Sequence, residues 1–218
     1  MPYTVIIPIH NEETNIPTLL EGMELYAKNH EILIIDDGST DGSAQLLTDC
    51  SFINLIKLEN NLGKGIAIRT GIENAKYDKI VITDGDLELD PKEINQLMIL
   101  DKMTGIKCVF GSRYEDINPF ESLWEFGNFF FTGLFNTVQG SNLSDALCCG
   151  KAFFKGDIKL DALQSTSFDI DVELASMLLK KLPAIEIIPL SYDRRKIHEG
   201  KKLRFKDGWK ILIRILSG

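Results

Sequence analysis

The chain has 218 residues, 44% of them apolar and 26% charged, and a formal net charge of −8. This is the composition of a globular protein with one large core, so we expect a single domain over residues 1–218. No apolar run approaches the ~20 residues that a membrane-spanning helix requires, and no signal-peptide pattern opens the chain. We therefore expect that the chain does not cross a membrane by itself.

Four cysteines lack Cys-x-x-Cys spacing, and two of them, Cys148 and Cys149, are adjacent in an apolar stretch. Small buried thiols are the usual state of such residues. We predict free cysteines in a reducing, cytoplasmic compartment.

Strands and helices alternate in the first half of the sequence. Strands are predicted at residues 3–9, 31–35, 53–58, 79–83 and 106–110. Helices are predicted at about 12–28, from about 43, at about 64–75 and from Pro91, which follows Asp90 as in a conventional helix start. The alternation predicts an α/β fold with a mostly parallel sheet.

Two acidic strings each follow a short apolar strand: DDGSTD at 36–41 and TDGDLE at 83–88. Either string alone would suit a surface turn, because Asp-Gly pairs are ordinary turn formers. Together they place four acids at the carboxyl ends of strands, where open α/β sheets bind ligands. Asp84 and Asp86 flank a tight turn and could both face one divalent cation.

These motifs resemble those of family 2 glycosyltransferases with the GT-A fold, and most of all the branch that makes polyprenyl-phosphate or dolichyl-phosphate sugars. The resemblance covers nearly the whole chain. The matching motifs are PIHNEE at 8–13, DDGSTDGS at 36–43, NLGKG at 61–65, TDGDLELDP at 83–91, GSRY at 111–114, Asp145 with CGKAF at 149–153, FDIDVEL at 168–174, YDRR at 192–195, EGKKL at 199–203 and DG at 207–208.

The resemblance implies an inverting, metal-dependent transfer of a hexose from a UDP- or GDP-linked donor to a polyprenyl or dolichyl phosphate. Mg²⁺ or Mn²⁺ is the implied cofactor, and the cytoplasmic membrane face is the implied location. Residues up to about 115 form the nucleotide-sugar half, and residues from about 116 to 218 form the acceptor half.

For the donor, the resemblance implies a nucleoside pocket formed by Pro8, His10 and Glu12 with Asp37. His10 stands where relatives often have Tyr, and its imidazole can still stack on a base. Lys64 follows a glycine at a predicted helix start and could offer a cation to a phosphate. A simple helix entry is the alternative for this short glycine motif.

The implied metal ligands are Asp84, Asp86 and Glu88, with Glu88 on the same side if its segment is extended. Relatives often carry Gln at the position of Glu88. The implied diphosphate and acceptor-phosphate ligands are Arg113 and the pair Arg195 and Lys202, where Lys201 could replace Lys202. The catalytic residues implied by the resemblance are Asp86, Arg113, Asp171, Arg195 and Lys202.

Asp169, Asp171 and Glu173 stand where family members that glycosylate hydroxyl groups have a general base. A phosphate acceptor is already a nucleophilic anion at neutral pH, so a strong base adds little. Asp171 and Glu173 could instead orient the acceptor or bind the basic tail. An exposed acidic helix start is the alternative.

The last 27 residues carry nine cations and three acids, together with several apolar residues. Such a tail could lie on an anionic membrane, or form a terminal helix that packs on its own domain. The stretch 123–138 poses a similar choice between core, dimer contact and a prenyl-chain groove, because it is rich in large apolar side chains, among them Trp124, Phe126, Phe129, Phe130, Phe131, Leu134 and Phe135.

The partners expected are a nucleotide sugar, a lipid phosphate, and either the membrane surface or a membrane-anchoring protein. A homodimer is a further option, and no nucleic acid is expected. Two other functions stay open: transfer to a saccharide hydroxyl in surface-polysaccharide assembly, and a catalytically silent nucleotide-sugar-binding subunit.

Overall fold

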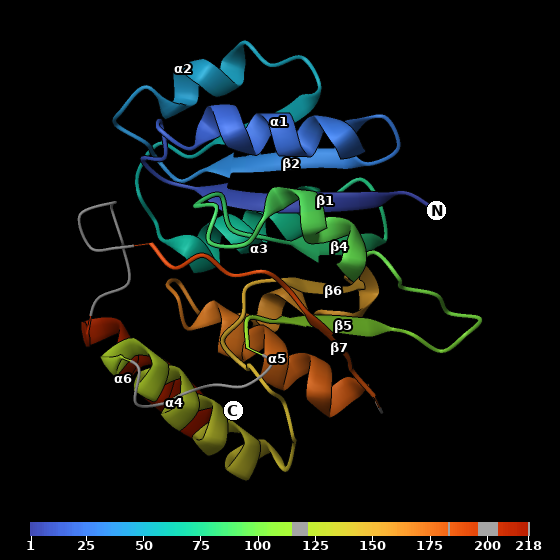
Figure 1. The fold of residues 1–218 in the computed structure, drawn as a ribbon, viewed down its shortest axis with the longest axis vertical. Helices are drawn as coiled ribbons and strands as arrows, with labels where there is room; N and C mark the ends of the chain where they lie inside the picture. The colour runs from blue at the N-terminus through green and yellow to red at the C-terminus, as the bar shows by residue number, and fades with distance from the viewer. Residues whose placement is uncertain (115–121, 183, 196–204, 218) are drawn as a thin grey trace.

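The computed structural model describes residues 1–114, 122–182, 184–195 and 205–217. It contains a seven-stranded sheet in the order β3-β2-β1-β4-β6-β5-β7, in which β6 is antiparallel to both of its neighbours and the other pairs are parallel. Figure 1 shows helices on both faces of this sheet. The predicted α/β class and the mostly parallel sheet are confirmed.

The strands are β1 (Tyr3–Ile9), β2 (Glu31–Asp36), β3 (Ile53–Lys57), β4 (Lys79–Ile82), β5 (Cys108–Ser112), β6 (Lys151–Phe154) and β7 (Glu186–Pro189). The helices are α1 (Ile16–Ala27), α2 (Ser43–Thr48), α3 (Lys64–Asn74), α4 (Leu123–Gln139), α5 (Ile170–Lys181) and α6 (Phe205–Ser217). Short 3₁₀ segments are η1 (Pro91–Leu97), η2 (Lys155–Asp157) and η3 (Leu160–Ala162).

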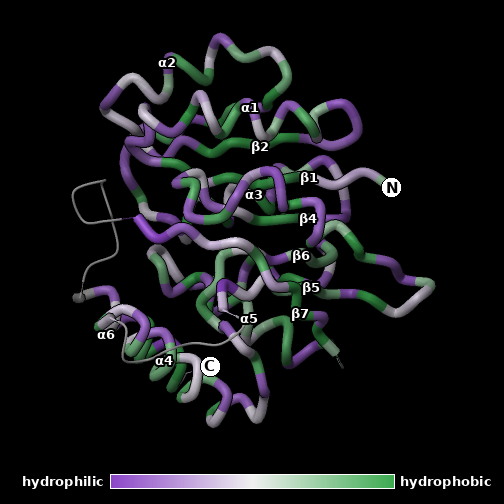
Figure 2. Tube along the Cα trace, in the orientation of Figure 1, coloured by the Kyte–Doolittle hydropathy of each residue, from purple (hydrophilic) through white to green (hydrophobic). Residues whose placement is uncertain are grey.

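Successive residues of the central strands point into two separate cores. In β1, Val5 and Ile7 pack with α1 and η1, whereas Ile6 packs with α3, α5 and α6. Side chains of a strand alternate between faces, so a run of consecutive apolar residues suits a sheet that is covered on both sides. Figure 2 shows these hydrophobic runs along β1, β2 and β4.

Two helices differ from their predictions, one in its first residue and one in its type. The first begins at Ile16 rather than near Glu12, because the residues before it form a turn in which Asn11 has a φ of 51° and Asn15 N–H donates to the carbonyl of Glu12. The segment from Pro91 is a 3₁₀ helix, whose start is capped by the Asp90 carboxylate through a bond from Lys92 N–H.

Helices α4 and α6 lie side by side at the end of the sheet that holds β5 and β7 (Figure 1). The α6 helix buries Ile211 and Ile215 in the core but leaves Trp209 and Ile213 exposed. It thus packs on its own domain and also presents an apolar face. The stretch 123–138 divides likewise: Phe135 is fully buried, whereas large apolar side chains elsewhere on α4 are exposed (Leu123, Phe126, Phe129, Phe130 and Val138).

In the described part of the chain, no helix has both the length and the apolar character needed to span a membrane. All four cysteines are free, and Cys108, Cys148 and Cys149 are buried.

Candidate active site

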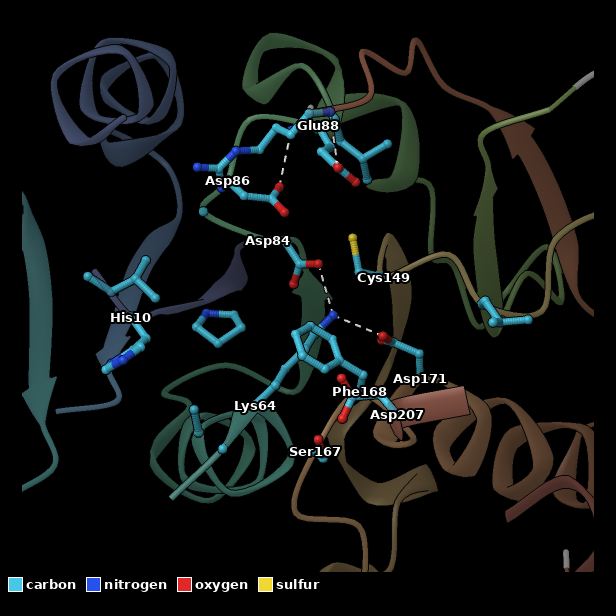
Figure 3. Close-up of a pocket in the computed structure, with 18 of the residues that line it drawn as sticks. His10, Lys64, Asp84, Asp86, Glu88, Cys149, Ser167, Phe168, Asp171 and Asp207 are labelled. Atoms are coloured by element: carbon cyan, nitrogen blue, oxygen red, sulfur yellow. Dashed lines mark hydrogen bonds and ion pairs between the residues drawn. The ribbon is translucent and has the colours of Figure 1, made fainter. Parts of the chain in front are cut away.

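A cavity of about 620 Å³ opens where β1, β2 and β4 end. It brings together eleven of the residues predicted for the site, which come from segments up to 187 positions apart in the chain: Pro8, His10, Glu12, Asp37, Lys64, Asp84, Asp86, Glu88, Arg113, Asp171 and Arg195. Figure 3 shows several of these side chains facing a common space. Lys202 and its alternative Lys201 lie outside the described residues.

His10 joins the ends of β1 and β2. His10 Nδ1 lies 2.8 Å from the backbone carbonyl of Asp37. Because a carbonyl only accepts, this nitrogen carries the proton and the ring is held in one orientation. The Asp37 carboxylate in turn accepts bonds from the backbone N–H groups of Leu62 at 2.7 Å and Gly63 at 2.8 Å. Asp37 therefore holds the loop before α3 against the sheet.

The acidic string after β4 is a turn rather than an extended segment. Leu87 has a φ of 64°, and Asp86 Oδ1 accepts a bond from Glu88 N–H at 3.1 Å. The Glu88 carboxylate accepts bonds from the Tyr192 hydroxyl at 3.1 Å and from Arg195 N–H at 3.2 Å. The extended geometry on which we expected Glu88 to join the two aspartates is therefore absent, although Glu88 still lines the cavity.

Crowding of carboxylates makes Asp86 unusual. Burial, followed by the negative charges of Asp84 and Glu88, raises the pKa of Asp86 to about 7. Seven carboxylates and four Lys or Arg side chains line the cavity. This excess of negative charge is unfavourable for a bound diphosphate unless a further cation joins it.

The chemistry of these residues fits a divalent cation. Asp84 and Asp86 offer the hard oxygen ligands that Mg²⁺ and Mn²⁺ prefer. Within the described ranges, no group of three or more His, Cys, Asp or Glu side chains forms a preassembled metal site. Mg²⁺ is usually held by one or two carboxylates plus substrate phosphates and water, so two aspartates meet that requirement.

Lys64, the first residue of α3, bridges two acids. Its Nζ lies 2.9 Å from Asp84 Oδ2 and 2.9 Å from Asp171 Oδ2, and all three side chains are largely buried (Figure 3). Burial lowers the pKa of Lys64, but the charges of Asp171 and Asp84 outweigh it and hold that pKa well above its ordinary value. Lys64 therefore stays protonated between the turn after β4 and the start of α5.

The arginines expected to bind phosphate are each paired with an acid. Arg113 Nε and Nη2 donate to the two carboxylate oxygens of Asp145 at 2.7 and 2.9 Å. Arg195 Nη1 donates to Glu12 at 3.1 Å. Such pairs hold the guanidinium groups at the cavity wall.

Asp169 and Glu173, two acids expected near the acceptor, have a structural task. Arg214 of α6 donates to Asp169 at 3.2 Å through Nε and lies 3.0 Å from Glu173 through Nη1. Glu173 also accepts bonds from the backbone N–H groups of Gln164 and Ser165. These buried contacts dock α6 on α5, as expected for an acid that binds the basic tail.

Several cavity residues were not among the predicted site residues. Arg194 Nη2 forms an ion pair of 2.6 Å with Glu125 of α4, and its Nε donates to the Tyr192 hydroxyl at 3.2 Å. Its place beside Arg195 in a basic motif was the available signal. Other members of the wall are Trp124, Asn128, Cys149, Phe168 and Asp207. Asp207 lies in a DG motif at 207–208 that the family resemblance included, whereas Asn128 is one of several polar residues in an aromatic stretch and carried no signal in the sequence.

A second, apolar pocket of about 280 Å³ lies between α4 and α6. It shares four wall residues with the polar cavity: Trp124, Asn128, Leu147 and Ile211. The rest of its wall includes Gly127, Phe130 and Leu212. The polar cavity and the hydrophobic groove are therefore neighbours that share part of a wall, and the groove lies beside the exposed faces of the two helices.

Relatives with assigned names match part of the chain. The undecaprenyl-phosphate 4-deoxy-4-formamido-L-arabinose transferase of Aeromonas hydrophila is 38% identical over 104 residues, which cover 44% of this chain and 32% of that protein. The protein of the same name from Pseudomonas fluorescens (strain Pf0-1) is 39% identical over 105 residues, covering 44% and 31%. The matched segment spans about a third of the length of these relatives.

Solved structures match nearly the whole chain. Glucosyl-3-phosphoglycerate synthase from Mycobacterium tuberculosis, in complex with Mn²⁺, UDP and glucosyl-3-phosphoglycerate, superimposes with a TM-score of 0.74 at 16% identity. The match covers 99% of this chain and 79% of that one. The complex of that synthase with Mg²⁺ and UDP gives a TM-score of 0.69 at 17% identity, covering 99% and 78%. The expected GT-A fold is confirmed.

The family model described as glycosyl transferase family 2 matches residues 4–160, which include β1 to β6 and most of the cavity wall. The order of the sheet and the acidic turn after β4 agree with this match. The chain therefore belongs to glycosyl transferase family 2.

Proposed function

We propose that this glycosyltransferase transfers a hexose from a nucleotide diphosphate sugar to a polyprenyl phosphate, with inversion at the anomeric carbon and with help from Mg²⁺ or Mn²⁺. In this reaction an acceptor phosphate oxygen bonds to the anomeric carbon. The bond from that carbon to the nucleoside diphosphate breaks, and the diphosphate leaves with the electron pair. The named relatives, whose matched part is short, support the same acceptor class.

The polar cavity supports the donor half of the proposal. Asp84 and Asp86 would hold the divalent cation, which offsets the negative charge that the departing diphosphate gains. His10 and Asp37 lie at the ends of β1 and β2, where the base and ribose would bind. Arg113 and Arg195 line the wall, and their planar guanidinium groups would bind phosphate oxygens.

The observation that carries the acceptor half is the position of the apolar groove between α4 and α6 directly beside the polar cavity, with which it shares four wall residues. A lipid phosphate has one anionic end and one long hydrocarbon tail. Its phosphate suits the cation-bearing cavity, and its first isoprene units suit the groove. A free sugar hydroxyl acceptor would give no use for an apolar channel at this position.

The exposed apolar side chains of α4 and α6 support contact with a membrane surface, since the groove opens between these helices. Trp209 and Ile213 would enter the headgroup region, while neighbouring cations such as Lys210 would meet anionic lipid. Peripheral binding at the cytoplasmic face, with or without an anchoring partner, is part of the proposal.

The decisive test is transfer of radiolabel from UDP- and GDP-sugars into organic-extractable lipid, with undecaprenyl phosphate and Mn²⁺ present. We expect label in the lipid with the native chain and none with Asp86→Ala. Metal-dependent hydrolysis of the donor without lipid label would move the acceptor to a saccharide. Absence of both signals would favour a silent nucleotide-sugar-binding subunit.

Asp171→Asn separates the two acceptor classes. A hydroxyl acceptor needs a base, so this substitution would abolish transfer to a saccharide. A phosphate acceptor is already ionised, so we expect transfer to the lipid to be weakened and not lost. Both rates are measured at saturating Mn²⁺, so that any change in metal affinity does not enter the comparison.

A further inference from the structure

Lys64 is in an unusual position for a cation near a metal site, because it is bonded to one of the proposed metal ligands. Its Nζ divides its bonds equally between Asp84 and Asp171, at 2.9 Å each. Asp84 belongs to the donor side, and Asp171 opens the first turn of the acceptor-side helix α5. One ammonium group therefore links the two halves of the site.

The second oxygen of Asp171 gives an independent sign that this arrangement awaits a ligand. Asp171 Oδ1 is buried and accepts no hydrogen bond from the described residues. A buried carboxylate oxygen without a donor is costly, so such an atom in a cavity wall points to a partner that arrives from outside. Sugar hydroxyl groups and water are donors that fit.

The backbone fixes where Lys64 starts. Gly63 has a φ of 99°, and a Cβ at this position would lie 2.1 Å from the carbonyl oxygen of Thr166. Gly65 N–H donates to that same carbonyl at 3.2 Å, and the Phe168 ring lies 5.7 Å from Lys64 Nζ. Only the long side chain of Lys64 is left to move, and its four-carbon stem allows the ammonium to turn.

We propose that Lys64 acts as a stand-in cation: it neutralises Asp84 in the absence of donor, and it turns to the donor diphosphate when a divalent cation takes over that carboxylate. Asp171 then loses its lysine and can accept a hydrogen bond from the bound sugar or acceptor. Lys64 is thus a positioning residue that couples donor binding to the readiness of the acceptor side. The inference rests on the proposed divalent-cation site, but not on the identity of the acceptor.

The proposal predicts that loss of the Lys64 charge changes the affinities for Mn²⁺ and for the nucleoside diphosphate in opposite directions. The substitution Lys64→Met removes the ammonium and leaves Asp84 without its partner. Mn²⁺ alone should then bind about tenfold tighter or more, since close charges in a buried site interact strongly. The same substitution removes a phosphate contact, so UDP or GDP should bind about tenfold weaker at saturating Mn²⁺. Asp171→Asn leaves Lys64 with a single partner, and Mn²⁺ alone should then bind more weakly.

These affinities are measured by calorimetry and by the electron paramagnetic resonance of free Mn²⁺, first with the metal alone and then with UDP or GDP. Lys102→Met is the matched control, because Lys102 pairs with Asp78 at 3.0 Å on the exposed surface. We expect no change in either affinity for that variant. Circular dichroism establishes that each variant is folded.

Unchanged or weaker binding of Mn²⁺ by folded Lys64→Met would overturn the proposal. If the lysine were merely structural, its substitution would weaken the binding of Mn²⁺ and of UDP or GDP together. If Lys64→Met does not fold, Asp171→Asn decides: unchanged or tighter Mn²⁺ binding in that variant overturns the proposal as well. None of these measurements uses an acceptor. Failure of lipid transfer therefore tests the proposed function separately from the role of Lys64.

Discussion

Arg113 and Asp145 form a two-bond ion pair in which Nε and Nη2 of the guanidinium each donate to a different oxygen of one fully buried carboxylate. Burial raises the pKa of Asp145, but the charge of Arg113 outweighs it and the pKa lies below its ordinary value. Arg113 directly follows β5 and Asp145 lies between α4 and β6, so the pair ties these two segments together at the cavity wall.

Removal of one partner from this pair should be costly. We expect Asp145→Ala to lower the free energy of unfolding by about 3–5 kcal/mol, because it leaves a largely buried guanidinium without its counter-charge. Urea denaturation measures the change. The exposed pair of Lys102 and Asp78 provides the control: Asp78→Ala should cost less than about 1 kcal/mol. Equal costs for the two substitutions would contradict the structural role given to Asp145.

The stability of the metal-free protein should fall as the pH rises from about 4 to 7. The folded-state pKa of Asp86 is about 7, against an ordinary value of 3.8, so the folded state binds more protons than the unfolded state within that window. The contribution is fully present below pH 4 and is lost as the pH passes 7.

Thermal unfolding with a chelator at several pH values tests this expectation. Asp86→Asn should flatten the decline, because the amide does not ionise, and Mn²⁺ should restore stability to the native chain at pH 7 and above. Asp49→Asn, an exposed site at the end of α2, should keep the native pH profile. An unchanged profile in Asp86→Asn would mean that another group causes the decline.

Filling the apolar groove should block a long lipid but spare a short one. A side chain at Gly127 would enter the groove, and a Cβ there meets no atom within 4 Å. In Gly127→Leu, the added side chain should exclude two or three methylene groups of the lipid from the groove. At ~0.8 kcal/mol each, this loss should raise KM for undecaprenyl phosphate about tenfold or more.

Gly133 offers the matched control on the same helix, since its Cβ would also be in open space and it does not line the groove. Gly133→Leu should keep the native KM. A short, water-soluble isoprenyl phosphate should be used equally well by both variants. If Gly127→Leu transfers to undecaprenyl phosphate like the native chain, the tail must bind elsewhere.

Membrane contact should depend on the exposed side of α6. Ile213 is 64% exposed, and so is Leu25 on α1, which packs on the other face of the sheet. We expect Ile213→Gln to weaken binding to anionic vesicles about tenfold, because an inserted Ile side chain contributes about 1.5–3 kcal/mol. Leu25→Gln should bind like the native chain. Co-sedimentation at low and high salt measures both, and equal binding of the two variants would place the membrane face elsewhere.

Much of the site was predictable because its residues follow strands. The bounds of β1 match the prediction, and the acids after β2 and β4 meet at one edge since carboxyl ends of parallel strands share that edge. The pairing of each cation was not predictable. Arg113 and Asp145 are 32 positions apart, and no local spacing selects that partner over the other acids of the chain.

Other features depend on packing that sequence patterns do not encode. The segment was expected to be extended, but it turns at Leu87, and the Glu88 carboxylate therefore accepts a bond from the Tyr192 hydroxyl. The apolar groove exists only because α4 and α6 meet, and both helices look merely amphipathic when taken alone. The basic tail was left with two alternatives, and α6 satisfies features of both, since one side packs on the core and the other is exposed.

The close approach of Gly63 and Gly65 to the carbonyls of Ser165 and Thr166 limits which substitutions this part of the fold can accept. Backbone touches backbone at this seam, so no side chain lies there that could shrink to relieve a clash. Any side chain at either glycine would push the loop before α3 away from the segment before α5, and Lys64 would move with it. Under the proposed function, variation in the acceptor is therefore accommodated more readily along α4 and α6, where side chains set the shape of the groove.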